Sequence, residues 1–110
     1  MLYKTSIRLW PRYEHALNNL ATVLLERKKK TSNIEANNLL VRALEVNSNY
    51  SVAWVNLGIV QSRLGKLKLS EVSYLRALSL RNGFYPDAHF NLGILYLKFK
   101  DKKEAALSEF

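Results

Sequence analysis

Residues 54–77 read WVNLGIVQSRLGKLKLSEVSYLRA, and the start of this stretch occurs three times in the chain. The phrase Asn56-Leu57-Gly58 has counterparts at Asn19-Leu20-Ala21 and Asn91-Leu92-Gly93, which lie 37 residues before it and 35 residues after it. A period of about 36 residues is typical of helical hairpins that stack on one another, because a single hairpin cannot bury its own apolar face. We therefore expect an all-α chain built from repeated helix pairs.

The apolar pattern divides each unit into two helices. Apolar residues recur three and four positions apart through residues 16–24, 53–64 and 90–99, as they do in amphipathic helices. Second helices are expected over residues 34–46 and 69–80. Turn-forming residues separate these segments: they are Thr31-Ser32-Asn33, Asn47-Ser48-Asn49, Gly65-Lys66 and Asn82-Gly83, with a further turn expected near Lys100–Lys103.

The spacing of small and bulky residues within the units matches the signature of the tetratricopeptide repeat, W-x2-L-G-x2-Y followed by A-x3-F and a later small residue. The middle unit fits it best, with Trp54, Leu57 and Gly58, then Ser70, Tyr74 and Ala77. Small residues at these positions let paired helices approach closely. The residues expected to pack between helices are Leu20, Ala21, Ala36, Ala43, Trp54, Leu57, Gly58, Tyr74, Ala77, Leu92, Gly93 and Tyr96.

The predicted fold is a tetratricopeptide-repeat α-solenoid truncated at both ends. Residues 14–50 and 51–85 form two whole units, and residues 86–110 form a partial third unit. Residues 1–13 have the spacing of the second half of a preceding repeat. The first unit carries about three extra residues in the stretch 27–33, which we place in an exposed turn.

The composition argues against a metal, cofactor or catalytic site within this chain. It has no cysteine, and His15 and His89 lie in separate units without a ligand at metal-binding spacing, so we expect no metal and no cofactor. No nucleophile motif, phosphate-binding loop or pair of carboxylates is present, so we expect no catalytic residue and no enzyme within these residues. No apolar run is long enough to span a membrane.

The net charge of +8 has several possible meanings. Nucleic-acid modules combine such charge with an identifiable reading motif, and none is present, so the residues argue against nucleic acid. A local excess of charge in one stretch of a longer protein is the favoured interpretation. Lys28, Lys29 and Lys30 form a basic cluster, which is interpreted as a solvated loop rather than a patch for an acidic partner.

The asparagine series Asn19, Asn56 and Asn91 is the best candidate binding site. All three residues share one register in the first helix of their unit, and in stacked hairpins these helices line the inner, concave wall. An amide both donates and accepts, which suits contact with the backbone of an extended peptide. The alternative is that these asparagines only bridge neighbouring repeats. The expected partner is a polypeptide.

Three stretches of the sequence are more specific than the general repeat signature. They are Pro11–Leu20, Ala53–Gln61 and Tyr85–Tyr96. With them, nearly the whole chain resembles the repeat region of the transmembrane and tetratricopeptide-repeat (TMTC) protein O-mannosyltransferases. The resemblance implies a parent protein in the endoplasmic reticulum membrane, with lumenal repeats, that transfers mannose to Ser or Thr of cadherin-type acceptor proteins. The catalytic part of that family lies in a multi-span membrane region, so no catalytic residue carries over to this chain.

Two further expectations concern location. Asn49-Tyr50-Ser51 is a glycosylation acceptor triplet, and Asn49 is used only if the chain is lumenal or secreted. The alternative to the transferase parent is a cytoplasmic adaptor or co-chaperone. Adaptors that hold a terminal carboxylate place cations next to the asparagine register, where this chain has Asn18, Val55 and Phe90, so this alternative has less support.

Overall fold

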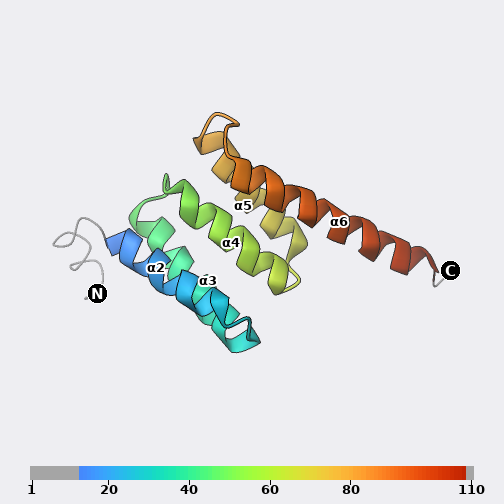
Figure 1. The fold of residues 1–110 in the computed structure, drawn as a ribbon, viewed down its shortest axis with the longest axis horizontal. Coiled ribbons are helices and arrows are strands. Elements are labelled where there is room, and N and C mark those ends of the chain that lie inside the picture. Colours follow the sequence, from blue (N-terminus) through green and yellow to red (C-terminus); the bar gives the residue numbers. More distant parts are fainter. Residues whose placement is uncertain (1–12, 109–110) are drawn as a thin grey trace.

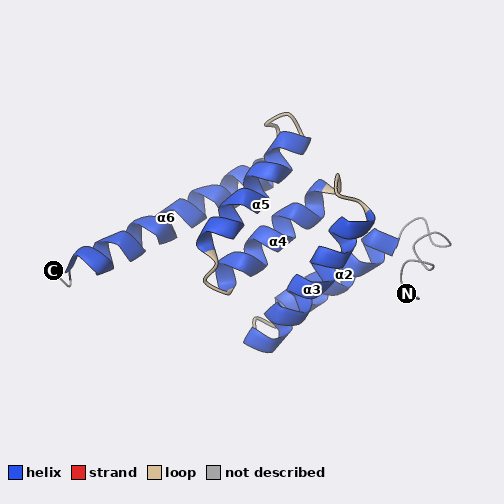
Figure 2. Cartoon of the chain, turned by 180° about the vertical axis from the view of Figure 1, so that it is seen from behind, coloured by secondary structure: helices blue, strands red, loops and turns tan. Residues whose placement is uncertain are grey.

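The structure, a computed structural model, describes residues 13–108 as five helices joined by short turns, with side chains described as far as Lys103. The helices, labelled as in Figure 1, are α2 (Tyr13–Glu26), α3 (Lys30–Val46), α4 (Ser51–Arg63), α5 (Leu67–Leu80) and α6 (Pro86–Ser108). No strand occurs within residues 13–108 (Figure 2). The predicted all-α architecture is confirmed. The interpretation of residues 1–13 falls almost entirely outside the described residues.

The helices are stacked in chain order. Helices α2 and α3 form one pair and α4 and α5 the next, and α3 packs against α4 while α5 packs against α6. Neighbouring elements therefore provide most of the packing, as expected for a solenoid whose units contact only their neighbours. The first helices of successive units also contact each other, α2 against α4 and α4 against α6.

Helices α4 and α5 are each followed by residues with a positive φ, which a right-handed helix cannot contain. Gly65 has a φ of 79° after α4, and Asn82 and Gly83 have φ values of 54° and 83° after α5. Glycine and asparagine adopt this left-handed conformation at low cost. Pro86 is the first residue of α6, where its missing N–H leaves no partner unsatisfied. These turns were predicted at the same residues.

The turn of the first unit is shorter than predicted. Helix α3 begins at Lys30, so Thr31, Ser32 and Asn33 are helical rather than in a turn. Lys28, with a φ of 54°, supplies the left-handed residue that ends the hairpin's first helix. The extra residues of this unit therefore lengthen α3 to 17 residues instead of extending the loop.

Helix α6 passes through the turn that was predicted near Lys100–Lys103. It continues without a break for 23 residues, from Pro86 to Ser108. The reason is local: residues 94–108 contain no glycine or proline, and Leu, Lys, Glu and Ala all have good helix propensity. No described helix folds back against α6 as the second half of a third hairpin.

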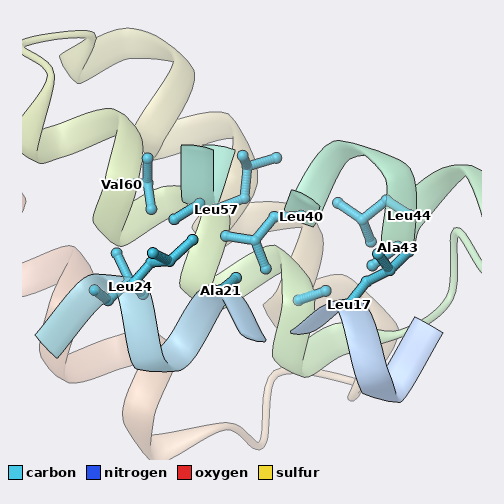
Figure 3. Close-up of a cluster of buried hydrophobic side chains, with 11 residues drawn as sticks. Leu17, Ala21, Leu24, Leu40, Ala43, Leu44, Leu57 and Val60 are labelled. Atoms are coloured by element: carbon cyan, nitrogen blue, oxygen red, sulfur yellow. The ribbon is translucent and has the colours of Figure 1, made fainter. Parts of the chain in front are cut away.

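Small residues allow the helices of the first unit to pack closely against each other and against α4. Ala21, Ala36 and Ala43 are completely buried, and Leu40 fills the space between the helices that they bring together (Figure 3). Leu57 and Val60 of α4 complete this cluster from the next unit. Burial of a leucine or valine side chain contributes about 1.5–3 kcal/mol, so the hairpins stabilise one another.

A second cluster joins α4, α5 and α6. Tyr74, Ala77 and Leu92, all predicted to pack between helices, are buried in it. Trp54 is half-buried against both clusters, and its indole Nε1–H donates to the Ser48 carbonyl oxygen over 2.8 Å. The middle unit therefore holds the two cores together.

Helices α4 and α5 approach each other closely at Gly58. A Cβ atom placed on it would lie 2.5 Å from Cε1 of Tyr74. The Ser70 hydroxyl, which is completely buried, donates to the Gly58 carbonyl oxygen over 2.6 Å. Only a residue without a side chain fits at this crossing.

Three residues predicted to pack between helices are exposed instead. Leu20 is 51% and Tyr96 46% exposed, and a Cβ atom on Gly93 would meet nothing within 4 Å. Leu20 and Gly93 occupy the repeat positions of Leu57 and Gly58, which are buried in the middle unit, but no described helix covers their faces. Position in a repeat predicts packing only where a neighbouring hairpin is present.

The helices do not have the character of membrane spans. Among the described residues, none combines the length and the apolar composition needed to cross a bilayer.

Candidate functional site

The first helices of the successive units form a continuous wall, which we call the α2–α4–α6 wall. It carries the asparagine series, with Asn19 on α2, Asn56 on α4 and Asn91 on α6. The structure places the three residues on the three expected helices, but their surroundings differ. The series is therefore not a ladder of equivalent amides.

Asn56 links two repeats. Its Nδ2–H donates to Oδ1 of Asn18 on the preceding helix, with a length of 2.9 Å. Asn18 is buried, and its backbone carbonyl oxygen accepts a hydrogen bond from the Thr22 hydroxyl over 3.0 Å. The bridging role weighed as the alternative for this series thus describes Asn56.

The side chains of Asn91 and Asn19 make no described hydrogen bond to another repeat. Nδ2 of Asn91 donates to the Asp87 carbonyl oxygen one turn earlier in α6, over 2.8 Å, which leaves its Oδ1 and a second N–H available. Asn19 is exposed, and no described hydrogen bond involves its side chain. A ligand can contact these two amides without breaking a bond between repeats, whereas the Asn56 amide holds such a bond.

A small cavity of about 80 Å³ lies between α4 and α6 beside Asn91. Ile59 and Ile94 supply apolar surface, and Ser62 and Lys98 supply a hydroxyl and an ammonium group. The Lys98 ammonium donates to the Ser62 hydroxyl oxygen over 2.6 Å, across the seam between the two helices. The wall here combines apolar and hydrogen-bonding groups within one crevice.

Sequence reasoning missed Arg63 and Lys98, which tie the repeats together, and gave the bridging role of Asn56 only as an alternative. Arg63 reaches from α4 to the preceding hairpin, where its Nη1–H donates to the Leu25 carbonyl oxygen over 2.7 Å. The bonds Asn56–Asn18, Arg63–Leu25 and Lys98–Ser62 join residues 38, 38 and 36 positions apart. Each separation is close to the repeat period, so pairs of polar residues one period apart are the signal that would have revealed them.

The tyrosines at the seams are neutral at physiological pH. Burial raises the pKa of the Tyr50 hydroxyl above its ordinary value of 10.0, although a hydrogen bond with Asn18 lowers it. Burial likewise raises the pKa of Tyr74, although a hydrogen bond with Ser70 and the charge of Arg63 lower it. No cluster of metal-ligating side chains occurs among the described residues.

Asn49, the glycosylation candidate, lies exposed in the turn between α3 and α4. Its backbone N–H donates to Oδ1 of Asn47 over 3.0 Å, which stabilises the turn. The third residue of the triplet, Ser51, is buried, and its hydroxyl oxygen accepts from Nε of Arg81 over 2.8 Å. The use of Asn49 stays a prediction.

Comparison with known proteins agrees with this geometry. The family model of the tetratricopeptide repeat matches residues 51–84, which are α4, α5 and the turn that follows them. Protein O-mannosyl-transferase TMTC3 of Homo sapiens is 36% identical over 91 residues, which are 81% of this chain and 10% of that protein. The chain thus spans about a tenth of the length of this curated relative. With its stacked helix pairs, the chain is a tetratricopeptide-repeat protein, a scaffold for protein interaction, and its repeats resemble those of the TMTC proteins.

Proposed function

We propose that this chain binds an extended polypeptide along the α2–α4–α6 wall. The observation that carries the proposal is the crevice between α4 and α6, where an amide, a hydroxyl and two isoleucines lie together. An extended peptide presents a backbone N–H or C=O at each residue and side chains on alternating sides. Amides such as Asn91 satisfy the first feature, and Ile59 and Ile94 offer apolar surface to the second.

The three asparagines have different roles in this proposal. Asn19 and Asn91 contact the peptide, because neither amide takes part in a described bond between repeats. Asn56 supports the wall instead, because its amide is bonded to Asn18. Binding therefore depends on Asn19 and Asn91 directly, and on Asn56 through the spacing of α2 and α4.

The parent protein in the proposal is an O-mannosyltransferase-like protein of the endoplasmic reticulum membrane. What supports it is the similarity to TMTC3, whose name states that activity, together with an acceptor triplet whose Asn49 is exposed. In such a parent the bound polypeptide is the acceptor, a Ser- and Thr-containing protein of the cadherin type. This chain then handles the acceptor and leaves the transfer reaction to another part of the protein.

The experiment measures the fluorescence anisotropy of labelled 15-residue peptides rich in Ser and Thr. We expect Asn19→Ala with Asn91→Ala to weaken binding by about tenfold, since each lost hydrogen bond contributes about 0.5–1.5 kcal/mol. The matched control is Asn38→Ala with Asn49→Ala, which removes two exposed amides outside the wall and should leave the affinity unchanged. Equal effects of the two pairs, or no binding by the unmodified chain, would contradict the proposal.

A further inference from the structure

The positive charge of the chain is concentrated in three segments, residues 26–30, 63–68 and 98–103. They contain eleven of the 17 Lys and Arg residues and two acidic residues, Glu26 and Asp101. Elsewhere within residues 13–103 there are three cationic and five acidic residues. The excess charge therefore belongs to these segments and not to the chain as a whole.

Hydrogen bonds between the helices show that the three segments lie on one side of the stack. Arg63 reaches the end of α2 through the Leu25 carbonyl oxygen, at 2.7 Å, and the start of α3 through Oδ1 of Asn33, at 3.5 Å. Lys98 reaches the end of α4 through Ser62. Figure 1 shows the α2–α3 and α4–α5 turns at the same end of their hairpins. We call this side, made by residues 26–30, 63–68 and 98–103, the basic edge.

The charges of the basic edge are not neutralised within the described chain. The acceptors of Arg63 and Lys98 are carbonyl, amide and hydroxyl oxygens, all of them uncharged. Among the described residues, no ion pair joins a cation of this edge to a carboxylate. Like charges within about 8–10 Å repel one another at ordinary ionic strength, so an anionic partner would relieve this repulsion.

An apolar pocket lies in the middle of the basic edge, between the start of α5 and the second half of α6. Its volume is about 630 Å³. Leu67, Leu69 and Phe99 supply the apolar surface, and Leu69 is 52% exposed. The remaining lining residues are Gly65, Lys66, Lys68, Lys102 and Lys103. Four lysine residues thus line a site that accepts apolar side chains.

From this combination we infer that the basic edge docks an acidic polypeptide segment that seats an apolar side chain in the Leu67–Leu69–Phe99 pocket. Charge complementarity selects the acidic class of partner. The apolar pocket selects a polypeptide, since a nucleic acid offers bases and phosphates but no aliphatic side chain. Lysines outnumber arginines nine to two at this edge, and flexible point charges suit carboxylates on an extended chain better than they suit bidentate phosphate recognition.

This surface goes beyond the proposed function, because it uses none of the asparagines of the α2–α4–α6 wall. A chain could therefore lose one binding activity and keep the other. The two proposals are separated by the Asn19→Ala, Asn91→Ala variant, which should bind an acidic peptide as well as the unmodified chain does.

The test uses the whole chain and a labelled twelve-residue peptide with Leu-Phe at its centre and five Glu on each side. We expect binding that weakens several-fold when salt rises from low to physiological concentration. Lys68→Glu with Lys102→Glu should weaken it by at least tenfold. The control pair Arg42→Glu with Arg76→Glu changes the net charge equally, but outside the basic edge, and should weaken it by less than twofold.

A second pair of variants tests the pocket. Leu69→Ser should weaken binding several-fold, whereas Val72→Ser, also exposed on α5 but outside the pocket, should not. The inference is overturned if the peptide does not bind, or if both charge pairs have equal effects. It is also overturned if single-stranded RNA or phosphatidylserine vesicles compete fully at equal anionic charge, since anionic charge alone would then account for binding.

Discussion

At the scale of single residues, the two glycines of the repeat signature show that one repeat position is packed differently in different units. Gly58 lies against the ring of Tyr74, whereas Gly93 faces open space. Both lie inside helices, where glycine is less favourable than alanine by about 1 kcal/mol. The cost of glycine is offset by close packing at Gly58 and has no such compensation at Gly93.

Alanine substitutions should therefore have opposite effects. We expect Gly58→Ala to lower the free energy of unfolding by about 1–3 kcal/mol, because the added methyl group displaces the Tyr74 ring. Gly93→Ala should raise it by about 0.5–1 kcal/mol. Urea unfolding followed by circular dichroism measures both changes. A stabilised Gly58→Ala variant would show that this crossing is looser than described.

At the scale of helices, hydrogen bonds one repeat period apart hold the hairpins in register. Asn18 and Asn56 pair across α2 and α4, and Asn18 is buried, so removal of one partner leaves an unsatisfied amide. Asn91 bonds only within α6. Residues at the same repeat position therefore contribute differently to stability.

The expected result is that Asn56→Ala lowers the free energy of unfolding by about 1–2 kcal/mol, while Asn91→Ala changes it by a few tenths. A double-mutant cycle with Asn18→Ala should give a coupling of about 0.5–1.5 kcal/mol. Additive effects of the Asn18 and Asn56 substitutions would show that the bond does not join the two helices energetically.

The helices also show which parts of the fold the sequence predicts. Turns marked by Gly65 and by Asn82-Gly83 were predicted correctly, because these residues act through their own backbone. The prediction of a turn at Lys100–Lys103 was wrong, because only the analogy with other repeats suggested it. The inter-repeat bond of Arg63 was not predicted, and that of Asn56 was only an alternative, since such bonds depend on how two helices sit against each other.

At the scale of the whole molecule, two surfaces with different chemistry emerge. The α2–α4–α6 wall offers amides and apolar groups, and the basic edge offers cations around an apolar pocket. The sequence predicted the first surface from the register of its asparagines. It did not predict the second, because a charge excess along the chain becomes a surface only when the hairpins bring their turns together.

The central claim is that polypeptide binds to the α2–α4–α6 wall, and photo-crosslinking tests it most directly. A benzoylphenylalanine residue placed at Thr22, Ile59 or Ile94 samples the wall on each of its three helices. The same residue at Val41 of α3, exposed away from the wall, is the control. With the Ser- and Thr-rich peptides, the account predicts crosslinks from the three wall positions and none from Val41. Equal crosslinking from Val41, or none from the wall, would contradict it.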